Sequence, residues 1–186
     1  MTGDRGRFLC HLPPGVTQGP SPVTPGGVGL LKIAVAGDSH GRIETVARSI
    51  QKAAPDCLFF TGDYYSDGIK LARWLDIDWF GVMGNCDYGH KGKQERQVTL
   101  AGRTLYLVHG HQYGVKRSLN SLFYRGQELG VDIVLFGHTH VPLCEKIAGT
   151  WFINPGSASL PRLGGTGNYA LIDLDENNIV PRIIEL

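Results

Sequence analysis

Five apolar segments of the chain end at a glycine that has Asp, Asn or His beside it, and this repeated ending constrains the fold more than any other feature. The segments are LKIAVAG before Asp38-Ser39-His40, DCLFFTG before Asp63, FGVMG before Asn85-Cys86-Asp87, TLYLVHG with His109 and His111, and DIVLFG before His138-Thr139-His140. Short apolar runs bounded by glycine are typical of buried strands. Because the carboxyl ends of parallel strands meet at one edge of a sheet, these polar side chains are expected to gather there.

The stretches between these segments predict helices first and further strands later. Residues 43–54, 67–75 and 115–129 show the apolar periodicity of helices. A hairpin is predicted to turn at residues 101–103, and the tail from residue 141 onward alternates strand-like runs with turns. A βαβαβ half followed by a β-rich half predicts one α/β domain in which sheets stack and helices lie outside.

The charge balance excludes some classes of protein. The chain has 186 residues, 42% of them hydrophobic, which is enough for one domain with a core. With 18 basic and 17 acidic residues and no basic stripe, a nucleic-acid surface is not favoured. No apolar run approaches the ~20 residues of a membrane helix, so no membrane association is expected.

The first 29 residues are rich in Pro, Gly, Ser and Thr and predict a disordered lead-in before a domain over residues 30–186. Alternatively, translation begins near Leu31, and intact mass would decide between the two. The stretch GVGLLKIAVA imitates a signal peptide, but five prolines precede it, and the apparent cleavage point adjoins GDSHG. The prediction is therefore a cytoplasmic protein.

The four cysteines do not suggest a metal knuckle or a disulfide framework. Cys10, Cys57, Cys86 and Cys144 are widely spaced and include no CxxC pair. Cys57 and Cys144 are interpreted as small residues of strands. Cys86 stands apart because it lies among the polar strand endings.

Each polar ending has an ordinary explanation when it is taken alone. Asp, Ser and Asn after a strand commonly cap helices or form turns, and a lone histidine is more often a core residue. Seven metal-capable side chains at the ends of five apolar segments favour a metal site instead. Mixed oxygen and imidazole ligands suit Mn²⁺, Fe²⁺, Ni²⁺, Co²⁺ or Zn²⁺ better than Mg²⁺ or Ca²⁺. Seven ligands exceed the need of one ion, so two ions about 3.5–4 Å apart, sharing a carboxylate, are expected.

The order DSHG, GD, GNCD, HGH and GHTH resembles the calcineurin-like metallophosphoesterases, and most of all their small single-domain bacterial and archaeal phosphodiesterase branch. The similarity runs from Leu31 to Leu186 and includes INPGSASLPR and NYALIDLD. It implies a four-layer α/β/β/α sandwich of two mixed β-sheets flanked by helices.

The resemblance also implies a role for each ligand. Asp38, His40 and His140 would hold the first metal; Asn85, His109 and His138 the second; and Asp63 would bridge them. The implied enzyme is a dinuclear-metal phosphodiesterase that cleaves small phosphate diesters by in-line attack of a metal-bridging hydroxide. Mn²⁺ is the preferred cofactor, with Ni²⁺, Fe²⁺, Co²⁺ or Zn²⁺ as alternatives.

One position departs from the family pattern. The broader family has His in the motif GNH[DE], and Cys86 occupies that place here, although the small branch often has Cys too. The general acid is therefore open among His111, a metal-bound water and Cys86. Asn85, Cys86 and His111 are the residues expected to contribute to catalysis. Asp87 is expected to orient a neighbour, and residues 154–157 to support the site.

Other functions remain as alternatives. A phosphomonoesterase or a dinucleoside polyphosphate hydrolase would use the same metal centre. A retromer subunit of eukaryotic vesicle sorting has this fold and serves as a non-catalytic scaffold, so a scaffold is a second class of function. The intact ligand set favours the enzyme. A nuclease is disfavoured by the near-neutral charge, and the sequence leaves self-association open.

Overall fold

The computed structural model describes residues 29–89, 91–162 and 165–186. The predicted lead-in over residues 1–29 lies outside the described residues except for Gly29, so its disorder and the alternative start stay predictions. The domain boundary at residue 30 is likewise a prediction.

The elements follow the predicted order. They are β1 (Leu31–Ala36), α1 (Glu44–Ala53), β2 (Cys57–Phe60), α2 (Tyr65–Leu75), β3 (Asp78–Gly81), β4 (Glu95–Leu100), β5 (Arg103–Val108), the 3₁₀ helix η1 (His111–Tyr113), α3 (Asn120–Leu129), β6 (Ile133–Leu135), β7 (Leu143–Ile147), β8 (Thr150–Asn154), β9 (Asn168–Leu174) and β10 (Ile179–Glu185). The hairpin predicted to turn at residues 101–103 is the β4–β5 pair.

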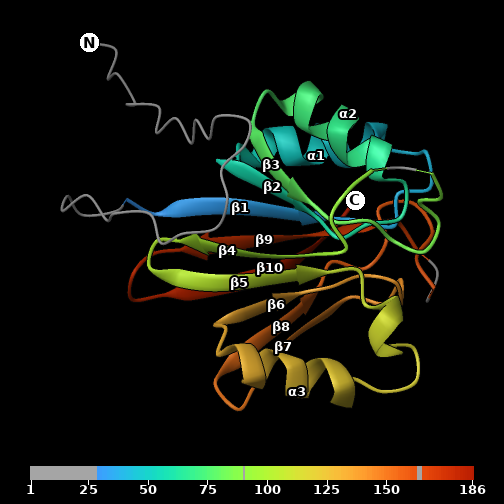
Figure 1. Ribbon diagram of the computed structural model, residues 1–186. Helices are drawn as coiled ribbons and strands as arrows, with labels where there is room; N and C mark the ends of the chain where they lie inside the picture. Colours follow the sequence, from blue (N-terminus) through green and yellow to red (C-terminus); the bar gives the residue numbers. More distant parts are fainter. Residues whose placement is uncertain (1–28, 90, 163–164) are drawn as a thin grey trace, which may run out of the picture.

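The strands form two five-stranded mixed sheets. The first sheet has the order β10-β9-β1-β2-β3 and the second the order β4-β5-β6-β8-β7. Strands β1, β2 and β3 run parallel in the first sheet, and β5, β6 and β8 run parallel in the second. The arrows of β1 and β5 point to the same side of the molecule in Figure 1, so the carboxyl ends of both parallel sets meet at one edge.

Three clusters of buried side chains separate four layers. One joins the facing surfaces of the two sheets, a second packs α1 and α2 on the first sheet, and a third packs α3 on the second. Figure 1 shows the resulting order, with α1 and α2 above both sheets and α3 below them. The predicted α/β/β/α sandwich is confirmed.

Strand β1 illustrates why the apolar runs are continuous. Ile33 and Val35 face the core between the sheets, whereas Ala34 and Ala36 face the helices. Successive side chains of a strand point to opposite faces, and here both faces are covered. Small alanines on the outer face let α1 pack closely on the sheet.

The predicted helix over residues 115–129 begins only at Asn120. Gly114, at φ 62°, ends the preceding 3₁₀ turn, and the N–H of Arg117 donates to its carbonyl oxygen at 2.9 Å. The Ser118 hydroxyl then accepts from the N–H of Asn120 at 3.1 Å, a local turn just before the helix. Val115 is buried as predicted, but a turn places it, not a helix.

Candidate metal centre

The seven predicted ligands lie on the loops that follow five strands. Asp38 and His40 follow β1, Asp63 follows β2, Asn85 follows β3, His109 follows β5, and His138 and His140 follow β6. Both sheets therefore contribute to one edge of the sandwich. Asp38, Asp63 and His109 are almost fully buried, with 0%, 2% and 0% of their surface exposed.

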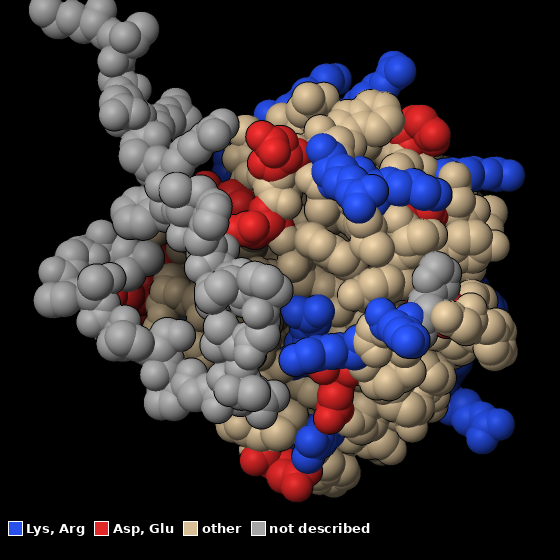
Figure 2. Space-filling view, turned by 45° about the horizontal axis from the view of Figure 1, so that its top comes forward, with Lys and Arg blue, Asp and Glu red and all other residues tan. Residues whose placement is uncertain are grey.

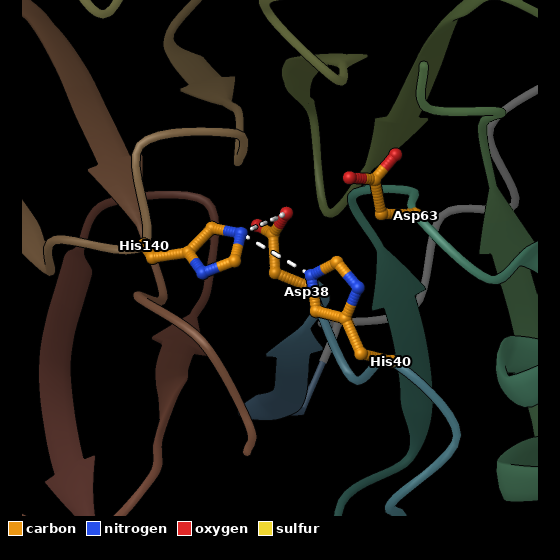
Figure 3. A group of neighbouring side chains, drawn as sticks. All are labelled: Asp38, His40, Asp63 and His140. Carbon is orange, nitrogen blue, oxygen red and sulfur yellow. Dashed lines mark hydrogen bonds and ion pairs between the residues drawn. The ribbon is translucent and has the colours of Figure 1, made fainter. Parts of the chain in front are cut away.

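The first group of side chains comprises Asp38, His40, Asp63 and His140, whose candidate ligand atoms all lie within 4.8 Å of one another. Figure 3 shows the carboxylate of Asp38 between the two imidazoles. The Nε2 atom of His140 lies 3.3 Å from Oδ1 of Asp38 and 3.3 Å from Nε2 of His40. Oδ1 of Asp38 is buried, and apart from the contact with Nε2 of His140 it has no hydrogen-bond partner among the described residues. A buried carboxylate oxygen in this state fits a cation ligand.

The second group comprises Asp63, His109 and His138, again with ligand atoms within 4.8 Å of one another. Oδ1 of Asn85 lies 3.1 Å from Nε2 of His109, which places the amide oxygen beside this group. Asp63 belongs to both groups, as a bridging carboxylate requires. Oδ1 of Asp63 lies 3.4 Å from Nε2 of His109.

Backbone carbonyls select the tautomer of two histidines. Nδ1 of His109 lies 2.8 Å from the carbonyl oxygen of Thr61, and Nδ1 of His140 lies 3.0 Å from that of Leu160. Since a carbonyl only accepts, each Nδ1 carries the hydrogen and donates, and the neutral ring keeps a lone pair on Nε2. Both Nε2 atoms point into the groups described above, so the residues fit a pair of divalent ions.

The charges around the centre differ between the two groups. The Asp38 carboxylate beside Nε2 raises the pKa of His140, whereas burial, followed by His109, lowers the pKa of His138 to about 4. Burial alone would raise the pKa of Asp63, but His109 and the N–H of Cys86 outweigh it and lower that pKa. Asp63 is therefore an anion near neutral pH, and His138 is neutral.

The backbone at the ligands is unusual. Asp38, His40, Asp63, His138 and His140 all have positive φ, between 46° and 69°. Asp and His tolerate this region better than most residues, but it costs roughly 1–3 kcal/mol at each position and is concentrated at functional sites. The ligand loops are thus held in a conformation that local preference does not supply.

Two glycines permit close packing behind the ligands. A Cβ at Gly84 would lie 2.1 Å from Oδ1 of Asp63, and a Cβ at Gly137 would lie 2.7 Å from Oδ2 of Asp38. Any side chain at either place would displace a carboxylate. This accounts for the glycines that recur beside the polar endings.

Asp67, a buried residue of α2, supports the first group and was missed by the sequence reasoning. Its Oδ2 accepts from the Ser39 hydroxyl and from the N–H of Gly41, both at 2.8 Å, and so holds the residues on either side of His40. An acidic residue in the first turn of a helix is common, so nothing in the sequence distinguishes Asp67 from an ordinary surface residue.

The predicted supporting residues do make such contacts. Asp87 accepts from the N–H of Gly84 at 2.7 Å, and thus orients backbone. The Asn154 amide donates to the carbonyl of Gly137 at 2.9 Å, and the Ser157 hydroxyl donates to the carbonyl of Asp38 at 2.7 Å. These bonds fix the loops after β1, β3 and β6.

The other predicted catalytic residues lie at the margin of the centre. Cys86 is exposed as a residue, and partial desolvation of its thiol, followed by a hydrogen bond to Asp63, raises the pKa of that thiol to about 11. The His111 ring centroid lies 5.4 Å from that of His109 and 6.0 Å from that of His138. Burial lowers the pKa of His111, and its Nδ1 has no hydrogen-bond partner among the described residues.

Comparison with known proteins identifies the family. Residues 31–177 match the calcineurin-like phosphoesterase superfamily domain. The chain is 32% identical over 159 residues to the probable metallophosphoesterase YsnB of Bacillus subtilis, across 83% of this chain and 91% of that protein. It is 26% identical over 176 residues to the phosphodiesterase YfcE of Escherichia coli, across 81% of this chain and 92% of that protein.

Solved structures share the fold. A predicted phosphoesterase from Streptococcus pneumoniae superposes with a TM-score of 0.72 at 26% identity, covering 85% of this chain and 91% of the other. Vps29 of Entamoeba histolytica, complexed with Zn²⁺, gives a TM-score of 0.66 at 20% identity, covering 83% of this chain and 99% of the other. At that identity, Vps29 supports the fold alone.

Proposed function

Because the chain belongs to the calcineurin-like phosphoesterase superfamily, we propose that it is a dinuclear-metal phosphodiesterase acting on small phosphate diesters. The proposal is carried by Asp63, the carboxylate shared by two groups of metal-capable side chains. Divalent ions are the cofactors of this family, and two of them would supply Lewis acidity and activated water for in-line attack at phosphorus.

Each candidate ligand is assigned to one of the two ions by the side chains that lie near it. Asp38, His40 and His140 would hold the first ion, and Asn85, His109 and His138 the second, with Asp63 between them. The carbonyls of Thr61 and Leu160 keep the hydrogen on Nδ1 of His109 and His140, so their Nε2 atoms serve as ligands. Mixed oxygen and nitrogen donors suit Mn²⁺, Ni²⁺, Fe²⁺, Co²⁺ and Zn²⁺. Mn²⁺ is proposed among them because of the resemblance to the small phosphodiesterase branch.

Cys86 and His111, at the margin of the metal centre, favour substrates with good leaving groups. A thiol with a pKa of about 11 is protonated at neutral pH, yet it is a poor match for general acid catalysis there. His111 has a lowered pKa and is neutral at pH 7. Neither side chain makes a strong proton donor. We infer that the leaving group departs largely unassisted by the chain, as a phenolate can.

The charge distribution does not favour a nucleic-acid substrate. On the part of the surface that Figure 2 draws in colour, basic and acidic side chains stand in separate small groups over a mostly uncharged face. Nucleic-acid binding normally needs a continuous basic surface. Within the described ranges, no helix has the length and apolar character needed to cross a bilayer. The cytoplasmic location and any self-association stay predictions.

A non-catalytic scaffold is the second candidate. Vps29 has this fold and is complexed with Zn²⁺ in a solved structure, so bound metal alone does not establish turnover. Cys86, in place of the family histidine, is the feature of this chain that would favour a scaffold.

The deciding experiment is metal-dependent hydrolysis. The purified protein is chelated, restored singly with Mn²⁺, Ni²⁺, Co²⁺, Zn²⁺ or Mg²⁺, and assayed with bis-p-nitrophenyl phosphate and p-nitrophenyl phosphate. Mn²⁺-dependent cleavage of the diester well above the monoester is expected. Preference for the monoester would support a phosphomonoesterase. Two bound ions per chain without any turnover would support the scaffold.

A further inference from the structure

A pocket of about 350 Å³ lies beside the candidate metal centre and is not part of it. Its walls are mostly apolar. They include Val115, Lys116, Phe136, Thr139, Val141 and Arg162. The volume is at the lower end of the range for small-molecule sites, roughly 300–1,000 Å³. It exceeds the roughly 150 Å³ that holds one benzene ring, so a ring with a substituent has room in it.

The pocket adjoins both loops of the second sheet that carry ligands. Thr139 of its wall stands between His138 and His140 in the chain, and the N–H of Arg162 donates to the carbonyl of His140 at 3.3 Å. Val115 packs against Gly110, where an added Cβ would lie 3.0 Å from Cγ2 of Val115. Gly110 separates His109 from His111. The pocket therefore lies next to the loops that carry His109, His138 and His140.

The wall next to the centre is held in place by hydrogen bonds. The Thr139 hydroxyl donates to the carbonyl of Val141 at 3.2 Å, and the Asn154 amide donates to Thr139 Oγ1 at 3.0 Å. Phe136 and Val115 are 1% and 6% exposed, so the core fixes the floor of the pocket. The pocket is thus built into the fold.

The lining has a definite charge character. It includes two cations, Lys116 and Arg162, and no acidic residue. Lys116 follows Val115, which packs against Gly110 between His109 and His111, so it lies near the centre. An apolar wall with cations at its margin complements an apolar group that carries negative charge.

We propose that this pocket binds the substituent of the phosphodiester that stays on phosphorus, and that it prefers an apolar, ring-sized substituent bearing a second negative charge. The inference rests on the proposed phosphodiesterase function and adds the substrate class to it. Lys116 and Arg162 act on specificity, and neither takes part in the chemical step.

The test uses diesters that share one leaving group. They are p-nitrophenyl phenyl phosphate, its 4-carboxyphenyl and 4-trimethylammoniophenyl counterparts, and methyl p-nitrophenyl phosphate. Because p-nitrophenolate leaves in every case, differences in kcat/KM report mainly on the retained substituent. The protein loaded with Mn²⁺ is expected to favour the carboxyphenyl over the trimethylammoniophenyl diester by about 10-fold or more, as a charged contact in a partly dry site allows.

Variants identify the residues responsible. Lys116→Glu is expected to abolish or reverse the charge preference, while Arg117→Glu, one residue away and outside the lining, leaves it unchanged. Val141→Phe narrows the pocket and should lower kcat/KM for the aryl diesters but not for methyl p-nitrophenyl phosphate. Equal effects of the Lys116 and Arg117 variants, or an equal effect of Val141→Phe on all four diesters, would overturn the proposal.

Failure of the pocket proposal and failure of the proposed function would give different results. If the protein cleaves the diesters without charge preference, the phosphodiesterase stands and the pocket proposal is wrong. If it cleaves none, binding of methyl 4-carboxyphenyl phosphate is measured by calorimetry. Weaker binding to Lys116→Glu than to Arg117→Glu would support the pocket, and equal binding to both would contradict it.

Discussion

The two sheets contribute different chemistry to the same edge of the molecule. The parallel strands of the first sheet are followed by Asp38, His40, Asp63 and Asn85, which supply mainly oxygen, whereas those of the second are followed by His109, His138 and His140, which supply only imidazole nitrogen. Each candidate metal group combines ligands from both sheets. Neither sheet alone could hold both ions, so packing of the apolar faces between the sheets creates the site.

The third parallel strand of each sheet extends the comparison. In the first sheet β3 is followed by Asn85, a candidate ligand, whereas in the second β8 ends at Asn154, which donates to the carbonyl of Gly137. The same residue type at corresponding places therefore serves once beside the metal and once as a support. The two asparagines therefore differ in role because of where each lies at the edge of the sandwich, although they are the same residue type.

Asp63→Asn should give the largest effect, because Asp63 is the one residue that both groups share. Loss of its charge is expected to lower the affinity for both ions by more than the ~10–100-fold that is typical of losing a supporting contact. Metal content after dialysis, measured by mass spectrometry, checks this. Asp76→Asn is the control, since that residue is exposed and its φ of 52° suits Asn. Two tightly held ions in Asp63→Asn would count against the assignment.

Substitution of one imidazole should separate the two groups. His140→Ala is expected to lower the affinity for the first ion by about 100-fold, and His138→Ala the affinity for the second ion by the same factor. In each variant the affinity for the other ion should change by less than about 10-fold. Titration calorimetry with Mn²⁺ would resolve the two sites. Equal loss of both ions in each variant would show that the groups are not distinct.

Asp67→Asn should have a smaller effect, limited to the first group. The amide can accept from Ser39 and Gly41 but lacks the carboxylate charge, so an affinity loss of about 10-fold at the first ion is expected. Lys70→Ala removes the exposed partner of Asp67 and should change metal affinity by much less. If Lys70→Ala has the larger effect on calorimetric affinity, Asp67 does not position His40.

The smallest expected effect is the difference between the pKa values of His138 and His140 in the metal-free protein. By NMR, His138 should titrate at about pH 4 and His140 above its ordinary value of 6.5. A lowered pKa means that His138 makes the fold less stable as the pH falls from 6.5 toward 4. A raised pKa means that His140 adds stability below pH 6.5, which is lost as the pH rises through its folded pKa. Identical pKa values would contradict the different surroundings of the two rings.

Much of the site could be read from the sequence because one rule governs it. Apolar runs that end in glycine and a polar residue become parallel strands, and parallel strands deliver their ends to one edge. The rule accounts for ligands that follow strands of one sheet, such as Asp38 and Asp63. Asp38 and His140 follow strands of different sheets, and their side chains lie 3.3 Å apart because the two sheets pack face to face. Two of the glycines that mark the endings, Gly84 and Gly137, are required because an added Cβ there would meet a ligand carboxylate.

The parts that the sequence could not reveal depend on packing between elements. Asp67 looks like an ordinary acid of a first helical turn until α2 is placed over the loop after β1. The late start of α3 follows from the left-handed Gly114 and from Ser118, which local periodicity does not register. The pocket near Lys116 combines segments from residues 115–119, 136–143 and 162, so no single motif encodes it.

The most direct test of the two-sheet metal centre is anomalous diffraction from crystals grown with Mn²⁺. Two anomalous peaks are expected on either side of Asp63, one among Asp38, His40 and His140 and the other among Asn85, His109 and His138. A single peak, or peaks away from the edge where the two sheets meet, would contradict a centre that both sheets build together.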